Sequence, residues 1–416
     1  MFLIFTEQRM KEYFKIAWRN LWRNRRRSFI TIASVLFAVF LALIMRSMQI
    51  GTYGYMVESA VKNSTGYIQV HGKGYWEDKS LENSLIYSEE LEEKIRNTPN
   101  VSSIVPRLES FALVSYGVQT KGVAVIGTVA GLEDKASGLQ NRLVKGAYLS
   151  ENQPGVLIPE GLADYLKVDV GDSIVLLGQG YQGVTAASLS EVTGIVRFLQ
   201  PDMNNQLLYM DLQQAQEFYA APGHLTSVSV MLENPGKLYQ TNKSLSEIDP
   251  DNLEVMTWKE MLVELLQYIE GDNISGLFML GILYVVVGFG ILGTILMMTM
   301  ERRKEFGVMV AVGMKRYKLS VIILIESMVI GILGVLAGIL LSMPIIVYFY
   351  HHPIQLAGEW AEAVKDFNME PILPFAWEPG FILNQGIVVL IITLLASIYP
   401  FMVISRLKVV NAIKGK

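Results

Sequence analysis

The sequence predicts an α-helical membrane protein with four transmembrane helices and a large α+β domain outside the cytoplasm. Three observations support this fold class. Of the 416 residues, 51% are hydrophobic and only 18% are charged, which is too apolar for a typical soluble protein of this length. Four apolar stretches are long enough to cross a bilayer. Basic residues gather at the ends of these stretches, whereas the long segment between the first two is acidic.

The four predicted membrane helices cover 28–48, 275–300, 319–349 and 383–405, and each meets the roughly 20 apolar residues that a span requires. A cleaved signal peptide is the alternative for the first of them. Its charged leader is unusually long and no small-x-small cleavage site follows Met48, so we expect an uncleaved anchor.

Lys and Arg are concentrated in 9–27, in 302–318 and in the tail 406–416. Acidic residues outnumber basic ones in 49–272, and Lys365 is the single basic residue of 350–382. Because cytoplasmic segments near membrane helices are enriched in Lys and Arg, we expect both termini and the loop 301–318 to be cytoplasmic. The region 49–272 and the loop 350–382 then lie outside.

The outside region alternates short β-rich runs with short helices. We predict strands at 65–72, 101–106, 121–129, 155–159, 172–177, 191–198, 206–210 and 226–232, and helices at 88–97, 160–167, 212–220 and 258–270. Thr257 and Glu260 form a capping-box pattern at the start of the last helix. We predict that this helix and the end of the first span form two helical stalks, which connect the outer domain to the membrane helices. Two surface helices beside a linker are the alternative, because Gly271 and Gly276 interrupt the pattern.

Several kinds of chemistry have no signature in this chain. It has no cysteine and no GxxxxGK[ST] phosphate loop, and its four histidines lack metal-ligand spacing. No GxSxG nucleophile motif occurs. We therefore expect no enzyme activity, no metal and no cofactor bound by this chain, and no nucleic-acid partner.

One charged residue lies inside a predicted span. An ionised Glu326 would cost about 2.5–3.5 kcal/mol at the centre of a bilayer on insertion scales. It is either a polar contact between helices that helps to transmit motion, or an interfacial residue near the headgroups. In the same span, Gly331, Gly334 and Gly338 have the small-xxx-small spacing that favours close helix packing.

The N-terminal segment 1–27 is predicted to hold a helix in the cytoplasmic membrane interface. Phe14, Trp18, Leu21 and Trp22 repeat at helical spacing among basic residues, which suits a helix whose tryptophans lie at headgroup depth.

The loop ERRKEFGVMVAVGMKRY (301–317) is charged at its start and apolar in its middle. A short amphipathic helix here would present Phe306, Met309 or Val310, and Gly313 on one side. Such a helix could dock into a groove on a soluble protein or lie on lipid, and its composition fits both.

Three motifs resemble the superfamily of ABC transporter membrane subunits that includes MacB, LolC/LolE and FtsX. The loop is similar to the coupling-helix signature of that family, with matches at Glu301, Arg302, Glu305, Ala311 and Gly313. The stretch AWRNLWRNRRRSFITIASV (17–35) resembles the segment before the first helix of the family. The tail resembles the family ending, with matches at Pro400, Arg406 and Val410.

The resemblance implies a mechanism without chemistry on this chain. Two membrane subunits pair as a homo- or heterodimer, and each docks on one of two copies of a separate cytoplasmic ATPase, which binds ATP and Mg²⁺. Motion then passes to porter-like parts at 49–130 and 224–272 and to a sabre-like insertion at 131–223. The docking residues carried over are Glu301, Arg302, Arg303, Glu305, Phe306, Gly307, Met309, Val310 and Gly313. The implied location is the bacterial inner membrane.

Size and layout are most similar to LolC/LolE-type subunits, which release lipoproteins from the inner membrane. In those relatives a hook recruits a periplasmic carrier, and the matching segment is 178–190, with Gly178, Gln179, Tyr181 and Gln182. A glycine-rich hairpin without a docking role is the alternative. A regulator of cell-wall hydrolases like FtsX, and an exporter of drugs or peptides that works with an adaptor like MacB, remain open as other functions.

Overall fold

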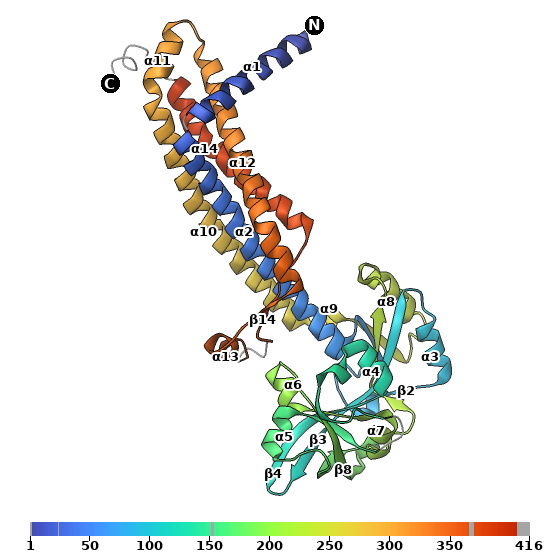
Figure 1. The fold of residues 1–416 in the computed structure, drawn as a ribbon. Coiled ribbons are helices and arrows are strands. Elements are labelled where there is room, and N and C mark those ends of the chain that lie inside the picture. The colour runs from blue at the N-terminus through green and yellow to red at the C-terminus, as the bar shows by residue number, and fades with distance from the viewer. Residues whose placement is uncertain (1, 24, 151–153, 366–369, 406–416) are drawn as a thin grey trace. The chain divides into compact units, whose positions relative to one another are not determined.

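The computed structural model describes residues 2–23, 25–150, 154–365 and 370–405 (Figure 1). The chain forms two compact units. The helical unit comprises Met1–Gly54, Tyr268–Ile354 and Leu373–Lys416, and the outer domain comprises Tyr55–Gln267 and Gln355–Ile372.

The helical unit is a bundle of long apolar helices. Its helices are α1 (Phe2–Arg23), α2 (Arg25–Ala60), α10 (Val263–Glu301), α11 (Arg303–Ala311), α12 (Arg316–His351) and α14 (Pro379–Ser405). In the described part of the chain, α2, α10, α12 and α14 are long and apolar enough to cross a membrane, and each contains one predicted span. The bundle core joins α2 to α14 through residues such as Val39, Leu43 and Val389.

The outer domain is built on a ten-stranded mixed sheet with the order β12-β1-β11-β3-β4-β9-β6-β8-β5, and β7 pairs with both β3 and β8. Its strands are β1 (Ile68–Gly72), β3 (Val101–Tyr116), β4 (Gln119–Thr128), β5 (Leu143–Gly146), β6 (Val156–Pro159), β7 (Ser173–Gln179), β8 (Thr185–Val196), β9 (Leu207–Asp211), β11 (Ser227–Leu232) and β12 (Leu253–Thr257). The pairings of β7 close β3, β4, β9, β6, β8 and β7 into a barrel. Short two-stranded sheets join β2 (Leu85–Ile86) to β10 (His224–Leu225), and β13 (Ile354–Gln355) to β14 (Ile372–Leu373).

Short helices cover this sheet. They are α3 (Glu89–Arg96), α4 (Ala130–Ser137), α5 (Glu160–Leu166), α6 (Pro201–Gln206), α7 (Leu212–Phe218), α8 (Leu238–Ser246) and α9 (Trp258–Met261). A further short helix, α13 (Glu359–Lys365), belongs to the second segment of the domain. A π-helical turn spans Val61–Thr65, and 3₁₀ turns span Leu81–Asn83, Leu139–Arg142, Tyr181–Gly183 and Pro235–Lys237. The predicted α+β domain with four long apolar helices is therefore confirmed.

Three hydrophobic clusters of buried residues hold the outer domain together, of which two are the largest. One fills the barrel with side chains such as Val114, Val123, Ile158 and Leu176. The other lies where β1 and β11 pack against α3 and α8. The hairpin β3–β4 contributes to the barrel. The predicted division into porter-like parts at 49–130 and 224–272 and a sabre-like insertion at 131–223 stays a prediction.

The helix predicted at 258–270 is interrupted. The carboxylate of Glu260 accepts a hydrogen bond from the backbone N–H of Thr257 at 2.7 Å, as the capping box requires, and it also accepts one from the Thr257 hydroxyl at 2.8 Å. The helix α9 ends at Met261, because the backbone angles of Leu262 (φ −104°, ψ 46°) are not helical, and α10 begins at Val263.

Candidate functional site

The loop between α10 and α12 folds into α11, and its aromatic residue faces inward. The side chain of Phe306 is 2% exposed and packs with Leu319 and Ile323 of α12 and Ile404 of α14. Met309 and Val310 are half-buried against the same cluster. The sequence prediction placed Phe306 on a face available to a partner, and the structure instead places it in the core that fixes α11 to the bundle.

A buried ion pair joins the start of α11 to the middle of the bundle. Nη1 of Arg302 donates to both carboxylate oxygens of Glu326 at 2.9 Å, and the two side chains are 8% and 4% exposed. The guanidinium carbon of Arg302 also lies 5.2 Å from the ring centroid of Phe306. Glu326 of α12 therefore makes a contact between helices, and its role in transmitting motion stays a prediction.

Two further ion pairs connect the N-terminal helices to this loop. Arg23, the last residue of α1, pairs with Glu305, and Arg27 of α2 pairs with Glu301. Because the Arg23–Glu305 pair is exposed on both sides, it contributes little stability on its own. Together with Arg302–Glu326, these contacts make the loop a junction of α1, α2, α10 and α12.

The outward face of α11 carries residues that the sequence prediction missed. Lys304, Val308 and Val312 are spaced by four residues and exposed, so they lie on one side of the helix. Gly307 is buried, Arg303 is half-buried, and Gly313 has φ +106° in the turn before α12. The four-residue spacing of these residues was visible in the sequence and indicates one helix face. Because Phe306 and Val308 are both apolar, however, the sequence does not show which of the two is buried.

Glycines of α12 provide close helix contacts. A Cβ atom at Gly334 would lie 2.5 Å from Cβ of Val35, and one at Gly338 would lie 2.7 Å from Cβ of Val39, both in α2. A Cβ at Gly331 would lie 3.1 Å from a methyl group of Thr393 in α14. These glycines let α12 approach two neighbours where a side chain would collide.

The aromatic residues of α1 form an exposed row. The rings of Phe14 and Trp18 are stacked with centroids 6.5 Å apart, and those of Trp18 and Trp22 are 6.1 Å apart. Leu21, predicted on the same face, is buried and packs with Met298, Val329 and Ile330. The helix thus has one side on the bundle and an aromatic side free for an interface.

The segment predicted as a hook is a tight hairpin between β7 and β8. Gly178 and Gln179 belong to β7, and Tyr181 and Gln182 lie in the 3₁₀ turn that follows. The Tyr181 N–H donates to the carbonyl of Tyr219 at 2.8 Å, and its ring centroid lies 4.6 Å from that of His224. These contacts hold the turn against the body of the domain.

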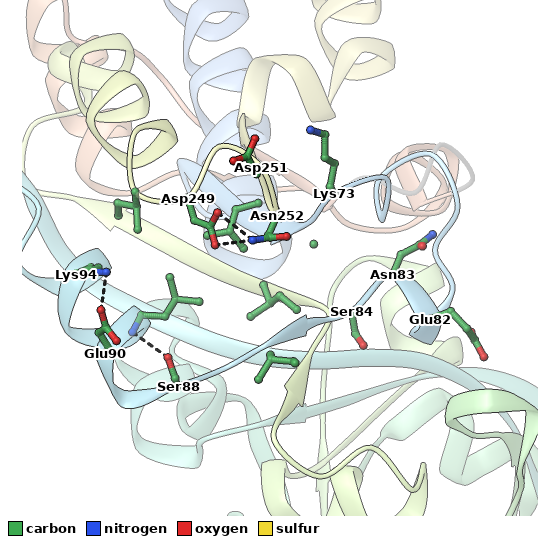
Figure 2. Close-up of a pocket in the computed structure, with 16 residues that line it drawn as sticks. Lys73, Glu82, Asn83, Ser84, Ser88, Glu90, Lys94, Asp249, Asp251 and Asn252 are labelled. Atoms are coloured by element: carbon green, nitrogen blue, oxygen red, sulfur yellow. Dashed lines mark hydrogen bonds and ion pairs between the residues drawn. The ribbon is translucent and has the colours of Figure 1, made fainter.

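A groove of about 710 Å³ opens beside β2 and α3 (Figure 2). Many of its polar side chains pair with one another. Glu90 pairs with Lys94 at 2.7 Å, and the amide of Asn252 donates to Asp249 at 3.1 Å. Because Glu90 and Lys94 are both well exposed, the groove has the character of a solvated surface.

Comparison with known proteins places the whole architecture in one family. The FtsX-like permease C-terminal family matches residues 277–409, and the MacB-like periplasmic core domain matches residues 28–248. The lipoprotein-releasing system transmembrane protein LolE of Haemophilus influenzae is 24% identical over 77% of this chain and 79% of that protein. The corresponding protein LolC of Xylella fastidiosa is 21% identical, and the match spans 58% of this chain and 60% of LolC. The crystal structure of the periplasmic region of MacB from Actinobacillus actinomycetemcomitans is similar at a TM-score of 0.36 and 12% identity, covering 50% of this chain and 95% of that one.

Proposed function

This chain belongs to the family of FtsX-like permeases with a MacB-like periplasmic core domain, which are non-catalytic membrane subunits of ABC transporters. From that premise we propose that it couples a separate cytoplasmic ATPase to its periplasmic domain. We propose further that this coupling releases lipoproteins from the inner membrane. In this proposal α11 is the docking element. ATP and Mg²⁺ bind to two copies of the ATPase, and two membrane subunits pair in the complex.

The observation that carries the coupling proposal is the two-sided character of α11. Its inner side is fixed by Phe306 and by the ion pair between Arg302 and Glu326. Its outer side offers Lys304, Val308 and Val312, a pattern of apolar anchors beside a charge that suits a groove on a soluble partner. A force applied to α11 would reach α12 directly, because separating this buried ion pair would leave two uncompensated charges.

The choice of lipoprotein cargo rests on the relatives named for lipoprotein release. LolE of Haemophilus influenzae and LolC of Xylella fastidiosa both carry that name.

The docking surface is tested by placing a charge on the outer side of α11. Val308→Asp should abolish copurification of the ATPase while leaving the protein in the membrane, because an apolar anchor would become a desolvated carboxylate. Val118→Asp is the matched control, since Val118 is also an exposed valine but lies in the outer domain. Retained ATPase with Val308→Asp would exclude this face as the docking surface.

The cargo is tested by depleting the protein in cells. We expect lipoproteins to remain in the inner membrane. Chains of unseparated cells with normal lipoprotein sorting would favour a regulator of cell-wall hydrolases, and drug sensitivity with normal sorting would favour an exporter.

A further inference from the structure

One outer face of the barrel carries exposed apolar side chains, although a solvent-facing surface of a sheet is ordinarily polar. Along β3, Ala112 and Val114 point into the barrel core, whereas Phe111 and Leu113 point out. Antiparallel strands with one solvated face ordinarily alternate apolar and polar residues. Here both sides of the strand are apolar, so the outer side requires a separate explanation.

The outward residues of three neighbouring strands lie next to one another. Leu113 of β3 is directly opposite Leu177 of β7, and Val175 of β7 is directly opposite Leu189 of β8. Phe111 and Leu189 are each 69% exposed. We call Phe111, Leu113, Val175, Leu177 and Leu189 the apolar barrel face; its strands lie in the lower part of Figure 1. Contiguous exposed apolar patches mark binding surfaces in soluble domains.

The apolar barrel face continues into a cavity of about 270 Å³. The cavity is lined by Phe111 of the face, by Ala124 and Ile126 of β4 and by Leu207 of β9. In the strand pairing, Phe111 is opposite Ala124, which is opposite Leu207. The same side of the sheet therefore runs from exposed leucines to a partly open pocket.

Polar groups stand at the other end of this cavity. Arg107 is buried and donates to both oxygens of Glu133 at 2.9 and 2.8 Å, so its charge is neutralised. Glu109 and the exposed Lys79 also line the cavity. Burial raises the pKa of Glu109, and the neighbouring Arg107 partly offsets that rise. The polar end therefore combines the ammonium group of Lys79, which lies 4.4 Å from the ring centroid of Trp76, with the carboxylate of Glu109, which lies 3.8 Å from the guanidinium of Arg107.

From this geometry we propose that the apolar barrel face and its cavity bind an amphiphile, with the alkyl chain along Leu189, Leu113 and Phe111 and the polar end at Lys79 and Glu109. A flat protein surface could cover the face but could not fill the cavity, whereas a slender chain does both. The proposal rests on the proposed function, because an acylated cargo is such an amphiphile, and it adds a contact site for that cargo in the outer domain.

The absence of cysteine allows a direct binding test on the full chain in nanodiscs of phosphatidylethanolamine and phosphatidylglycerol. A polarity-sensitive dye is attached at Leu113→Cys, and a palmitoylated polar peptide is added. We expect a saturable blue shift with this peptide and none with the same peptide lacking the acyl chain. Phe111→Ser and Leu189→Ser should each weaken the response at least tenfold. Val118→Ser, an exposed position at the β3–β4 turn, should leave it unchanged.

Two results would overturn the proposal. One is no response of the dye to the acylated peptide. The other is a blue shift that depends on protein concentration without peptide, which would identify the face as an interface with a second copy. Copurification of the ATPase is measured on the same preparation. If the ATPase is retained without an acyl response, only this inference fails, whereas loss of the ATPase from the unsubstituted chain counts against the proposed function. Unchanged thermal unfolding of the serine variants shows that they are folded.

Discussion

At the scale of single residues, the ion pair between Arg302 and Glu326 dominates the candidate coupling region. Both side chains are almost fully buried, so each charge depends on the other for compensation. Desolvation makes such a pair a weak source of net stability, but the loss of one partner leaves an uncompensated charge. The pair therefore serves to hold α11 and α12 in one arrangement.

This reasoning predicts an asymmetric mutational pattern. Glu326→Ala should destabilise the protein by about 3–5 kcal/mol, because the guanidinium of Arg302 would remain buried and unpaired. The double variant Arg302→Met with Glu326→Leu should recover much of that loss. Thermal unfolding of the purified protein in detergent measures both, with Glu90→Ala as a control at an exposed carboxylate. Equal losses in the single and double variants would contradict a coupled pair.

Residue roles in α11 show where sequence reasoning stops. Glu301, Arg302 and Glu305 could be singled out from the charged motif, and the structure gives each an ionic partner. The inward direction of the Phe306 side chain could not be predicted from the motif, because it depends on packing against Leu319 and Ile404. These residues belong to other helices, and no local pattern reports their position.

At the scale of elements, the packing of α12 on α2 depends on two glycines. With ideal Cβ atoms, Gly334 and Gly338 would collide with Val35 and Val39. Close approach of this kind lets dispersion contacts and backbone proximity replace the hydrophobic effect, which is weak between helices in lipid.

A larger residue at this contact should separate the helices. Gly338→Leu is expected to cost about 1–3 kcal/mol, the usual range for overpacking, because its Cβ would also lie 2.9 Å from the carbonyl oxygen of Leu36. Gly290→Leu in α10 is the matched control, since its Cβ would meet no atom within 4 Å. The midpoints of thermal unfolding in detergent compare the two. Equal midpoints for both variants would show that the contact is not structurally important.

Long apolar runs made the four spanning helices predictable from the sequence, and eight strand predictions overlap eight observed strands. The elements that were not predicted are either short or have no helix-breaking residue at their boundary. The four-residue strand β5 pairs with β8 through non-local bonds. The break at Leu262 has neither proline nor glycine at that residue to announce it, so α9 and α10 read as one helix.

At the scale of the whole molecule, charge is divided between the segments that the long helices separate. Basic residues dominate 302–318, whereas acidic residues dominate 49–272. Positive charge near helix ends is retained in the cytoplasm during insertion. This distribution predicts that α11 lies on the cytoplasmic side and the barrel on the opposite side, as the proposed transmission of motion across the membrane requires.

The cysteine-free sequence makes this topology directly testable. Val118→Cys in the outer domain and Val312→Cys after α11 are both highly exposed positions, so each should react readily with a maleimide. In spheroplasts, a membrane-impermeant maleimide should label the first variant and spare the second, which should become reactive only after lysis. The unsubstituted chain is the control for background labelling. Labelling of both positions in intact spheroplasts would place α11 and the barrel on one side, where docking on a cytoplasmic ATPase could not drive a domain beyond the membrane.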